Sequence, residues 1–321
     1  MRALIDLLTL ALAGVAPGDR AATSTTTVAS TTAQADQATS QTQDLRLSRD
    51  GYDRMTVAVE VGDSGPYRFL VDTGAERTVI SRQLAERLGL VSGIPARIQS
   101  VAGGSDAATV DIPALRVSSR QFAIANAPTL EADHIGADGM LGVDSLAVSQ
   151  VLFDFRHGVM EISPSRESGV DEAGTIVVEA RRKHGRLMFT HAAIEGRDAV
   201  VVIDTGSQIS IGNPELRRKL LGGRPVGELV EIETVVGEKI MAEIHPMRTL
   251  ELGGVTLKGM IIAFTDAPVF RQLELDRRPA LLLGMNALRG FDRVSIDFAT
   301  RRVRFVLPGS SMASALRLAT N

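Results

Sequence analysis

The chain has 321 residues, a formal net charge of -3 and no cysteine. Its length allows two domains of medium size with a sizeable core. The slightly negative charge gives no support for a nucleic-acid partner, and the lack of cysteine excludes disulfides, thiol catalysis and cysteine-bound metal. The five histidines are not at metal-ligand spacing, so we expect no metal and no cofactor.

Residues 1–20 have the pattern of a secretory signal peptide, with a basic start, an apolar run over 3–13 and small residues after it. The run is shorter than the about 20 apolar residues that a membrane helix needs, so we expect an exported, periplasmic or secreted protein with no stable membrane span. Asp6 inside the run leaves an additional amphipathic helix, or a start assigned too early, as alternatives. Residues 21–44 are mostly Thr, Ser, Ala and Gln, and are predicted to be a flexible tether.

Residues 45–165 are predicted to form a first lobe made mainly of strands. Apolar alternation and short apolar runs predict the strands, and turn residues separate them. Ser81 is a candidate cap for a short helix that Gly89 ends, and Gly103 and Gly104 form the tip of a hairpin. The predicted elements, in order, are 56–61 with 67–71, 78–80, the helix to 88, 98–105 with 108–112, 115–117 with 122–124, a short helix at 143–146, and 151–155 with 159–162.

Residues 166–178 are predicted to be a linker, because turn-forming and polar residues prevail between 163 and 174. Residues 179–308 then repeat the pattern of the first lobe. Asn213 followed by proline is a good start for a helix that Gly222 ends. The repeated strands are 188–194 with 199–203, the hairpin 230–236 with 239–244, then 250–252, 260–262, 281–283 and 294–298, and residues 309–321 are predicted to be a frayed tail.

Each half contains an apolar strand that ends in Asp-Thr-Gly, at 72–74 and at 204–206. Each tripeptide is followed, at a similar distance, by two apolar residues and a glycine, at 140–142 and 282–284. Two aspartates brought together at such strand ends can share one proton and activate a water molecule, which is the chemistry of an aspartic protease. A single Asp-Thr-Gly is a weak signal, but its repetition in the same context is a strong one.

These motifs resemble the retropepsin-like aspartic protease family, over about residues 50–162 and 180–307. The resemblance implies an all-β fold of two tandem lobes related by a pseudo-twofold axis, with one aspartate from each lobe and a hairpin over the substrate. It implies the catalytic residues Asp72 and Asp204. The supporting residues that it implies are Thr73, Gly74, Thr205, Gly206 and Ser207, and the flap or substrate-binding residues are Gly103, Gly104, Val236 and Gly237.

The two aspartates are not expected to be equivalent. Like charges so close together cannot both ionise, so the pair holds one proton over a working range of pH. Ser207 is able to donate a hydrogen bond to Asp204, whereas Ala75 cannot do so for Asp72. This difference predicts that Asp72 is the member that holds the proton.

We interpret the chain as an aspartic endopeptidase that cleaves an extended polypeptide, itself an exported protein, and acts as a monomer with an internal pseudo-dimer. Two alternatives stay open, a catalytically silent peptide-binding or scaffold protein, and lobes that act through intermolecular dimers. Asp154 and Asp297 also follow apolar strands, but no Thr-Gly follows them, so we expect them to cap turns. The basic cluster at 181–184 is expected to be a solvated loop.

Overall fold

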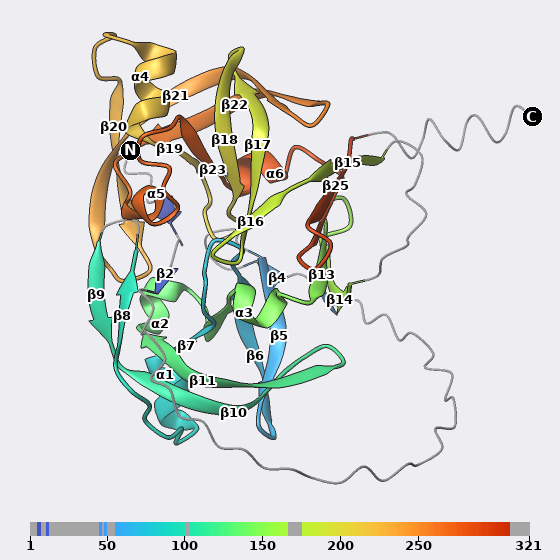
Figure 1. The fold of residues 1–321 in the computed structure, drawn as a ribbon. Helices are drawn as coiled ribbons and strands as arrows, with labels where there is room; N and C mark the ends of the chain where they lie inside the picture. The colour runs from blue at the N-terminus through green and yellow to red at the C-terminus, as the bar shows by residue number, and fades with distance from the viewer. Residues whose placement is uncertain are drawn as a thin grey trace, which may run out of the picture.

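The structure is a computed structural model that describes residues 5–7, 11–12, 45–46, 48–49, 55–100, 103–165 and 175–308. Strands dominate this part of the chain and form two halves, at the bottom and the top of Figure 1. Most of the predicted signal peptide and tether, much of the predicted linker and the predicted tail lie outside the described residues. No helix in the described ranges is long and apolar enough to cross a lipid bilayer.

The first half is built on the predicted hairpin of β5 (Met55–Val61) and β6 (Ser64–Val71). β6 also pairs in parallel with β12 (Gly139–Leu141), so β6 is flanked on both sides inside the sheet. Ser81 caps α1 (Arg82–Arg87) as predicted, because its side chain accepts a hydrogen bond from the backbone N–H of Leu84 at 3.1 Å. The other elements of this half are β4 (Ser48–Arg49), β7 (Val79–Ser81), β10 (Thr109–Val117), β11 (Arg120–Leu130), α2 (Ala132–Ile135) and α3 (Val143–Leu146).

The second half repeats this arrangement. β17 (Arg186–Ile194) and β18 (Arg197–Ile203) form the hairpin, and β18 pairs in parallel with β23 (Ala280–Leu283). α4 (Pro214–Leu221) starts at the predicted cap, where the Asn213 side chain accepts from the N–H of Leu216 at 2.8 Å, and it ends at Gly222. The remaining elements are β16 (Arg181–Lys183), β19 (Ser210–Gly212), β22 (Val255–Phe264), α5 (Pro268–Gln272) and α6 (Met285–Leu288).

A third sheet joins the halves, on the right of Figure 1. Its order is β15 (Thr175–Glu179), β25 (Arg302–Val306), β24 (Arg293–Asp297), β13 (Ser149–Asp154), β14 (Val159–Pro164) and β3 (Leu45–Arg46). The closing hairpins of the two halves thus become one sheet through the antiparallel pairing of β13 with β24. Residues 175–178 of the predicted linker form most of β15, and Ile176 and Val178 pack against the core.

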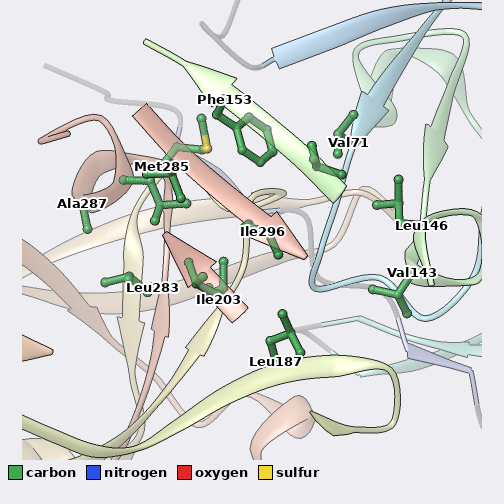
Figure 2. Close-up of a cluster of buried hydrophobic side chains, with 14 of the residues drawn as sticks. Val71, Val143, Leu146, Phe153, Leu187, Ile203, Leu283, Met285, Ala287 and Ile296 are labelled. Atoms are coloured by element: carbon green, nitrogen blue, oxygen red, sulfur yellow. The ribbon is translucent and has the colours of Figure 1, made fainter. Parts of the chain in front are cut away.

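The main hydrophobic core is continuous across the two halves. Figure 2 shows buried side chains from both of them gathered in one cluster. Val71 and Ile203, the residues before the two Asp-Thr-Gly tripeptides, both belong to it, as do Phe153 and Ile296 of the shared sheet. Burial of large apolar side chains contributes about 1.5–3 kcal/mol each. The ends of β6 and β18 are therefore held against a common apolar base.

A long hairpin extends from each half toward the other. The hairpin of the first half is β8 (Ala96–Gln99) with β9 (Gly104–Ala107), and that of the second is β20 (Glu228–Thr234) with β21 (Lys239–Leu252). Two short N-terminal strands lie on their edges. β1 (Ile5–Leu7) runs parallel to β20, and β2 (Ala11–Leu12) runs antiparallel to β8.

Candidate active site

Asp72 and Asp204 occupy equivalent places, directly after β6 and β18. The backbone N–H of Asp72 donates to the Leu141 carbonyl at 3.0 Å, and the N–H of Asp204 donates to the Leu283 carbonyl at the same distance. Each aspartate is thus fixed at the end of a buried strand by the neighbouring parallel strand. Both aspartates are fully buried, with 0% of their surface exposed.

The two threonines that follow the aspartates join the lobes reciprocally. The Thr73 hydroxyl donates to the Ile203 carbonyl at 3.1 Å and accepts from the N–H of Thr205 at 3.1 Å. The Thr205 hydroxyl donates to the Val71 carbonyl at 2.8 Å and accepts from the N–H of Thr73 at 3.0 Å. Each hydroxyl uses its donor and an acceptor position on the opposite lobe, so the aspartate-bearing loops are locked in one register.

Glycine is required after Thr73 because the opposite aspartate lies against it. A Cβ atom on Gly74 would come within 2.5 Å of Asp204 Oδ1. Without that atom, the N–H groups of Gly74 and Ala75 donate to Asp72 Oδ1 at 2.7 and 3.0 Å. The N–H of Gly206 donates to Asp204 Oδ1 at 3.1 Å in the other lobe. The backbone therefore orients both carboxylates.

The environment favours a proton on Asp72. Burial raises the pKa of Asp72 well above its ordinary value, and the charge of Asp204 raises it further. The N–H of Gly74, the cation of Arg186 and the N–H of Ala75 act in the opposite direction. Asp72 Oδ1 accepts the hydrogen bonds from the backbone N–H groups. Oδ2 is buried without a hydrogen-bond partner among the described residues. Oδ2 is thus the oxygen suited to carry the proton.

The predicted role of Ser207 needs correction. Its hydroxyl donates to the Ile209 carbonyl at 2.6 Å, so its single proton is not directed at Asp204. The acceptor is thus a backbone carbonyl of the local turn. Asp72 as the proton-holding member stays a prediction, and burial together with the charge of Asp204 is now its basis.

A second pair of equivalent contacts holds the two loops that carry the aspartates against the short helices. Asp144, on α3, accepts from the N–H and hydroxyl of Thr78 at 2.9 and 2.7 Å. Asn286, on α6, accepts from the N–H and hydroxyl of Ser210 at 2.9 and 2.8 Å. Asp144 and Asn286 each stand two residues after the glycine of their half. They therefore tie the short helices to the strands that follow the aspartates.

The predicted flap residues lie at the tips of the two long hairpins. Gly103 directly precedes β9 and accepts from the N–H of Ser100 at 2.7 Å, and Gly104 is the first residue of β9. Val236 and Gly237 form the turn between β20 and β21. The second tip reaches the first half, because Val235 is buried in a cluster with Ile98 and Ile135. The structure thus brings the two tips to the same side of the molecule.

Two charged residues beside the aspartates, Arg186 and Glu76, were not among those predicted from the sequence. Arg186, at the start of β17, is 0% exposed and donates from Nε to the Gly74 carbonyl at 2.6 Å. Its Nη1 lies 3.7 Å from Oε1 of Glu76. A sequence signal was present, since Arg54 and Arg186 stand at the same distance before their aspartates. Arg54 lies outside the described residues.

The other candidates lie apart from this site. Asp154 accepts from the N–H of His157 at 2.9 Å, and Asp297 accepts from the N–H of Thr300 at 2.9 Å, so both cap turns as predicted. The expectation of a loop at 181–184 was wrong for its first three residues. They form β16, which pairs antiparallel with the start of β17 across the tight turn at 184–185.

The chain matches the family model for aspartyl protease in two regions, residues 57–145 and 190–287. One similar solved structure is a retropepsin-like aspartic protease from Rickettsia conorii, with 21% identity, 41% of this chain and 89% of that chain covered, and a TM-score of 0.31. No curated protein matches this chain. The two matched regions each contain one Asp-Thr-Gly, and the predicted all-β fold of two tandem lobes is confirmed.

Proposed function

This chain belongs to the aspartyl protease family, and we propose that it is an aspartic endopeptidase whose two lobes form one active site. The observation that carries the proposal is the pair of reciprocal threonine bonds, which hold Asp72 and Asp204 side by side at the lobe interface. A buried pair of carboxylates in this arrangement retains one proton, because two negative charges so close together are unfavourable.

The reaction needs no group beyond these two carboxylates and water. The ionised aspartate, Asp204 in the arrangement we favour, accepts a proton from water as the water attacks the peptide carbonyl carbon. The protonated aspartate, Asp72, donates its proton to the carbonyl oxygen, which gives a neutral tetrahedral intermediate. Proton transfer to the amide nitrogen then accompanies cleavage of the C–N bond. The dyad titrates as a unit, with two macroscopic pKa values.

The long hairpins support a proposal for how a substrate is held. β1 and β2 of this chain add to the edges of β20 and β8, one strand in each half. The segment that carries them runs parallel to one hairpin and antiparallel to the other, as any strand must when it crosses two hairpins related by a twofold axis. Strand addition of this kind supplies backbone hydrogen bonds without regard to side chains. We infer that an extended polypeptide, itself exported, adds to the same edges.

The test is cleavage of a diverse peptide mixture, read by mass spectrometry from acidic to neutral pH. The proteins are the parent chain, Asp72→Asn, Asp204→Asn and the control Asp266→Asn, whose side chain is exposed and lies in an ion pair with Arg271. We expect the parent and the control to cleave, and each dyad variant to be inactive. A parent that never cleaves, while still binding peptides, supports the silent peptide-binding alternative.

Mixing the two dyad variants separates an internal site from an intermolecular one. If each lobe paired with a lobe of another chain, an equimolar mixture of Asp72→Asn and Asp204→Asn would contain intact dyads and regain activity. We expect no recovery, because the threonine bonds are made within one chain. Sedimentation of the active parent as a monomer would agree with this result.

A further inference from the structure

We propose that Arg186 is a positioning residue that holds the loop after Asp72 across the lobe interface and, together with Glu76, tunes the charge of the dyad. This inference rests on the proposed function of Asp72 and Asp204. Arg186 comes from the second lobe, whereas Glu76 and Gly74 belong to the first. The contact therefore forms only when the two lobes are assembled.

The geometry shows why this arginine is buried. Its Nε donates to the Gly74 carbonyl at 2.6 Å, and Gly74 is the residue that lies against Asp204. A charged side chain costs several kcal/mol to bury unless it gains partners, so a buried arginine is retained where its bonds are specific. Glu76 is the nearby carboxylate, with 21% of its side chain exposed and 3.7 Å between Oε1 and Nη1 of Arg186. The pair fixes both ends of the loop segment 74–76.

Charged groups from both lobes surround the dyad. Arg186 is on β17, and Glu76 and Arg77 are on the loop after β6. Asp144 is on α3, where its Oδ2 lies 3.8 Å from Nε of Arg77. These two residues form an ion pair, so their charges offset each other. Burial lowers the pKa of Arg186, while Glu76, Asp204 and Asp72 raise it. Arg186 in turn lowers the pKa of Asp72. The guanidinium thus favours the singly ionised dyad.

The second lobe lacks the carboxylate of this arrangement. Gln208 stands after Asp204 at the distance at which Glu76 stands after Asp72. Its Nε2 atom is buried and has no hydrogen-bond partner in the described part of the chain. The charge near the dyad is therefore adjustable from the first lobe, through Glu76, and not from the equivalent position of the second.

The test compares pH profiles of kcat/KM for Arg186→Gln, Arg186→Lys and Glu76→Gln. Removal of the cation stabilises the protonated dyad, so we expect the acid limb of Arg186→Gln to move up by about one pH unit. Removal of the neighbouring anion should move the limb of Glu76→Gln down. Lysine keeps the charge but has no planar guanidinium, so Arg186→Lys should keep the limb near that of the parent while kcat falls. Arg248→Gln, at an arginine whose side chain is 91% exposed, is the matched control and should change neither quantity.

A merely structural role predicts that both neutral variants lose activity without opposite shifts of the acid limb. Limbs that move in the same direction, or that do not move, overturn the inference. If Arg186→Gln does not fold, Glu76→Gln and Arg186→Lys still carry the test. Titration of the Asp carboxyl carbons by NMR reads the dyad without turnover. Opposite shifts there in a protein that cleaves nothing would support this inference and refute the proposed function.

Discussion

The bond network of Thr205 allows a test of how the lobes are joined. Thr205→Val keeps the shape of the side chain but removes the hydroxyl that binds the Val71 carbonyl at 2.8 Å and the N–H of Thr73 at 3.0 Å. Both partners belong to the other lobe. They are buried, as are Asp72 and Asp204 beside them. The substitution therefore leaves a buried carbonyl and a buried N–H of the first lobe without this partner.

A buried polar group that loses its partner costs about 1–3 kcal/mol, so the two groups together should lower the free energy of unfolding by about 2–6 kcal/mol. Thr205→Ser keeps the hydroxyl and loses one methyl group, which costs about 0.8 kcal/mol. The valine variant should thus be less stable than the serine variant by at least about 1 kcal/mol. We expect kcat to fall in the same order, because the loops that carry the aspartates lose their register.

Urea unfolding followed by circular dichroism measures this difference. The matched control is Thr234→Val, at a threonine that is 1% exposed and whose hydroxyl has no hydrogen-bond partner among the described residues. This control should be as stable as the parent or slightly more so, since no bond is lost. Equal stabilities for Thr205→Val and Thr205→Ser would refute the reasoning, because the hydroxyl would then contribute nothing across the interface.

Three further outcomes are expected. Gly74→Ala should abolish cleavage, because the new methyl group would lie 2.5 Å from Asp204 Oδ1, whereas Gly223→Ala, in open space, should cleave like the parent; an active Gly74→Ala variant would contradict the packing. The pKa of Glu243 is lowered to about 2, chiefly by its hydrogen bond with Arg217. Its ionised form therefore stabilises the fold at pH values above the ordinary pKa of glutamate, and this contribution is lost as the pH falls through about 2. Glu243→Gln should then be less stable than the parent near pH 6 in thermal unfolding, with a difference that shrinks toward pH 2 and would not shrink if packing alone were responsible. A chain that begins at residue 45 should have a lower KM than the full chain, because β1 and β2 no longer compete for the edges of β20 and β8, and an unchanged KM would show that these edges do not receive substrate.

Local signals predicted much of the secondary structure. The caps at Ser81 and Asn213 and the strand ends at Asp72 and Asp204 depend on residues within a few positions in the chain, so they can be read without knowing the fold. The turn caps at Asp154 and Asp297 are equally local. These elements were predicted correctly because no distant contact competes with the local one.

Contacts between the halves could not be read in this way. The shared sheet pairs β13 with β24, and nothing in either hairpin alone specifies the other as its neighbour. Arg186 was not singled out in the sequence, and only the assembled interface shows that its partner is Gly74. Ser207 failed for the opposite reason, because a carbonyl two residues away accepted the proton that we had assigned to Asp204.

The fusion of two lobes in one chain explains why the site is symmetric in its backbone and asymmetric in its charges. The threonine bonds need the same residue in both halves, and both halves have it. At the positions of Glu76 and Asp144, however, the second half has the corresponding amides, Gln208 and Asn286. Two identical chains would carry the same side chain at both places. One chain is free to differ. Glu76 and Asp144 each lie beside an arginine, while amides stand at the equivalent positions of the second half, so a proton on the dyad meets two unequal environments.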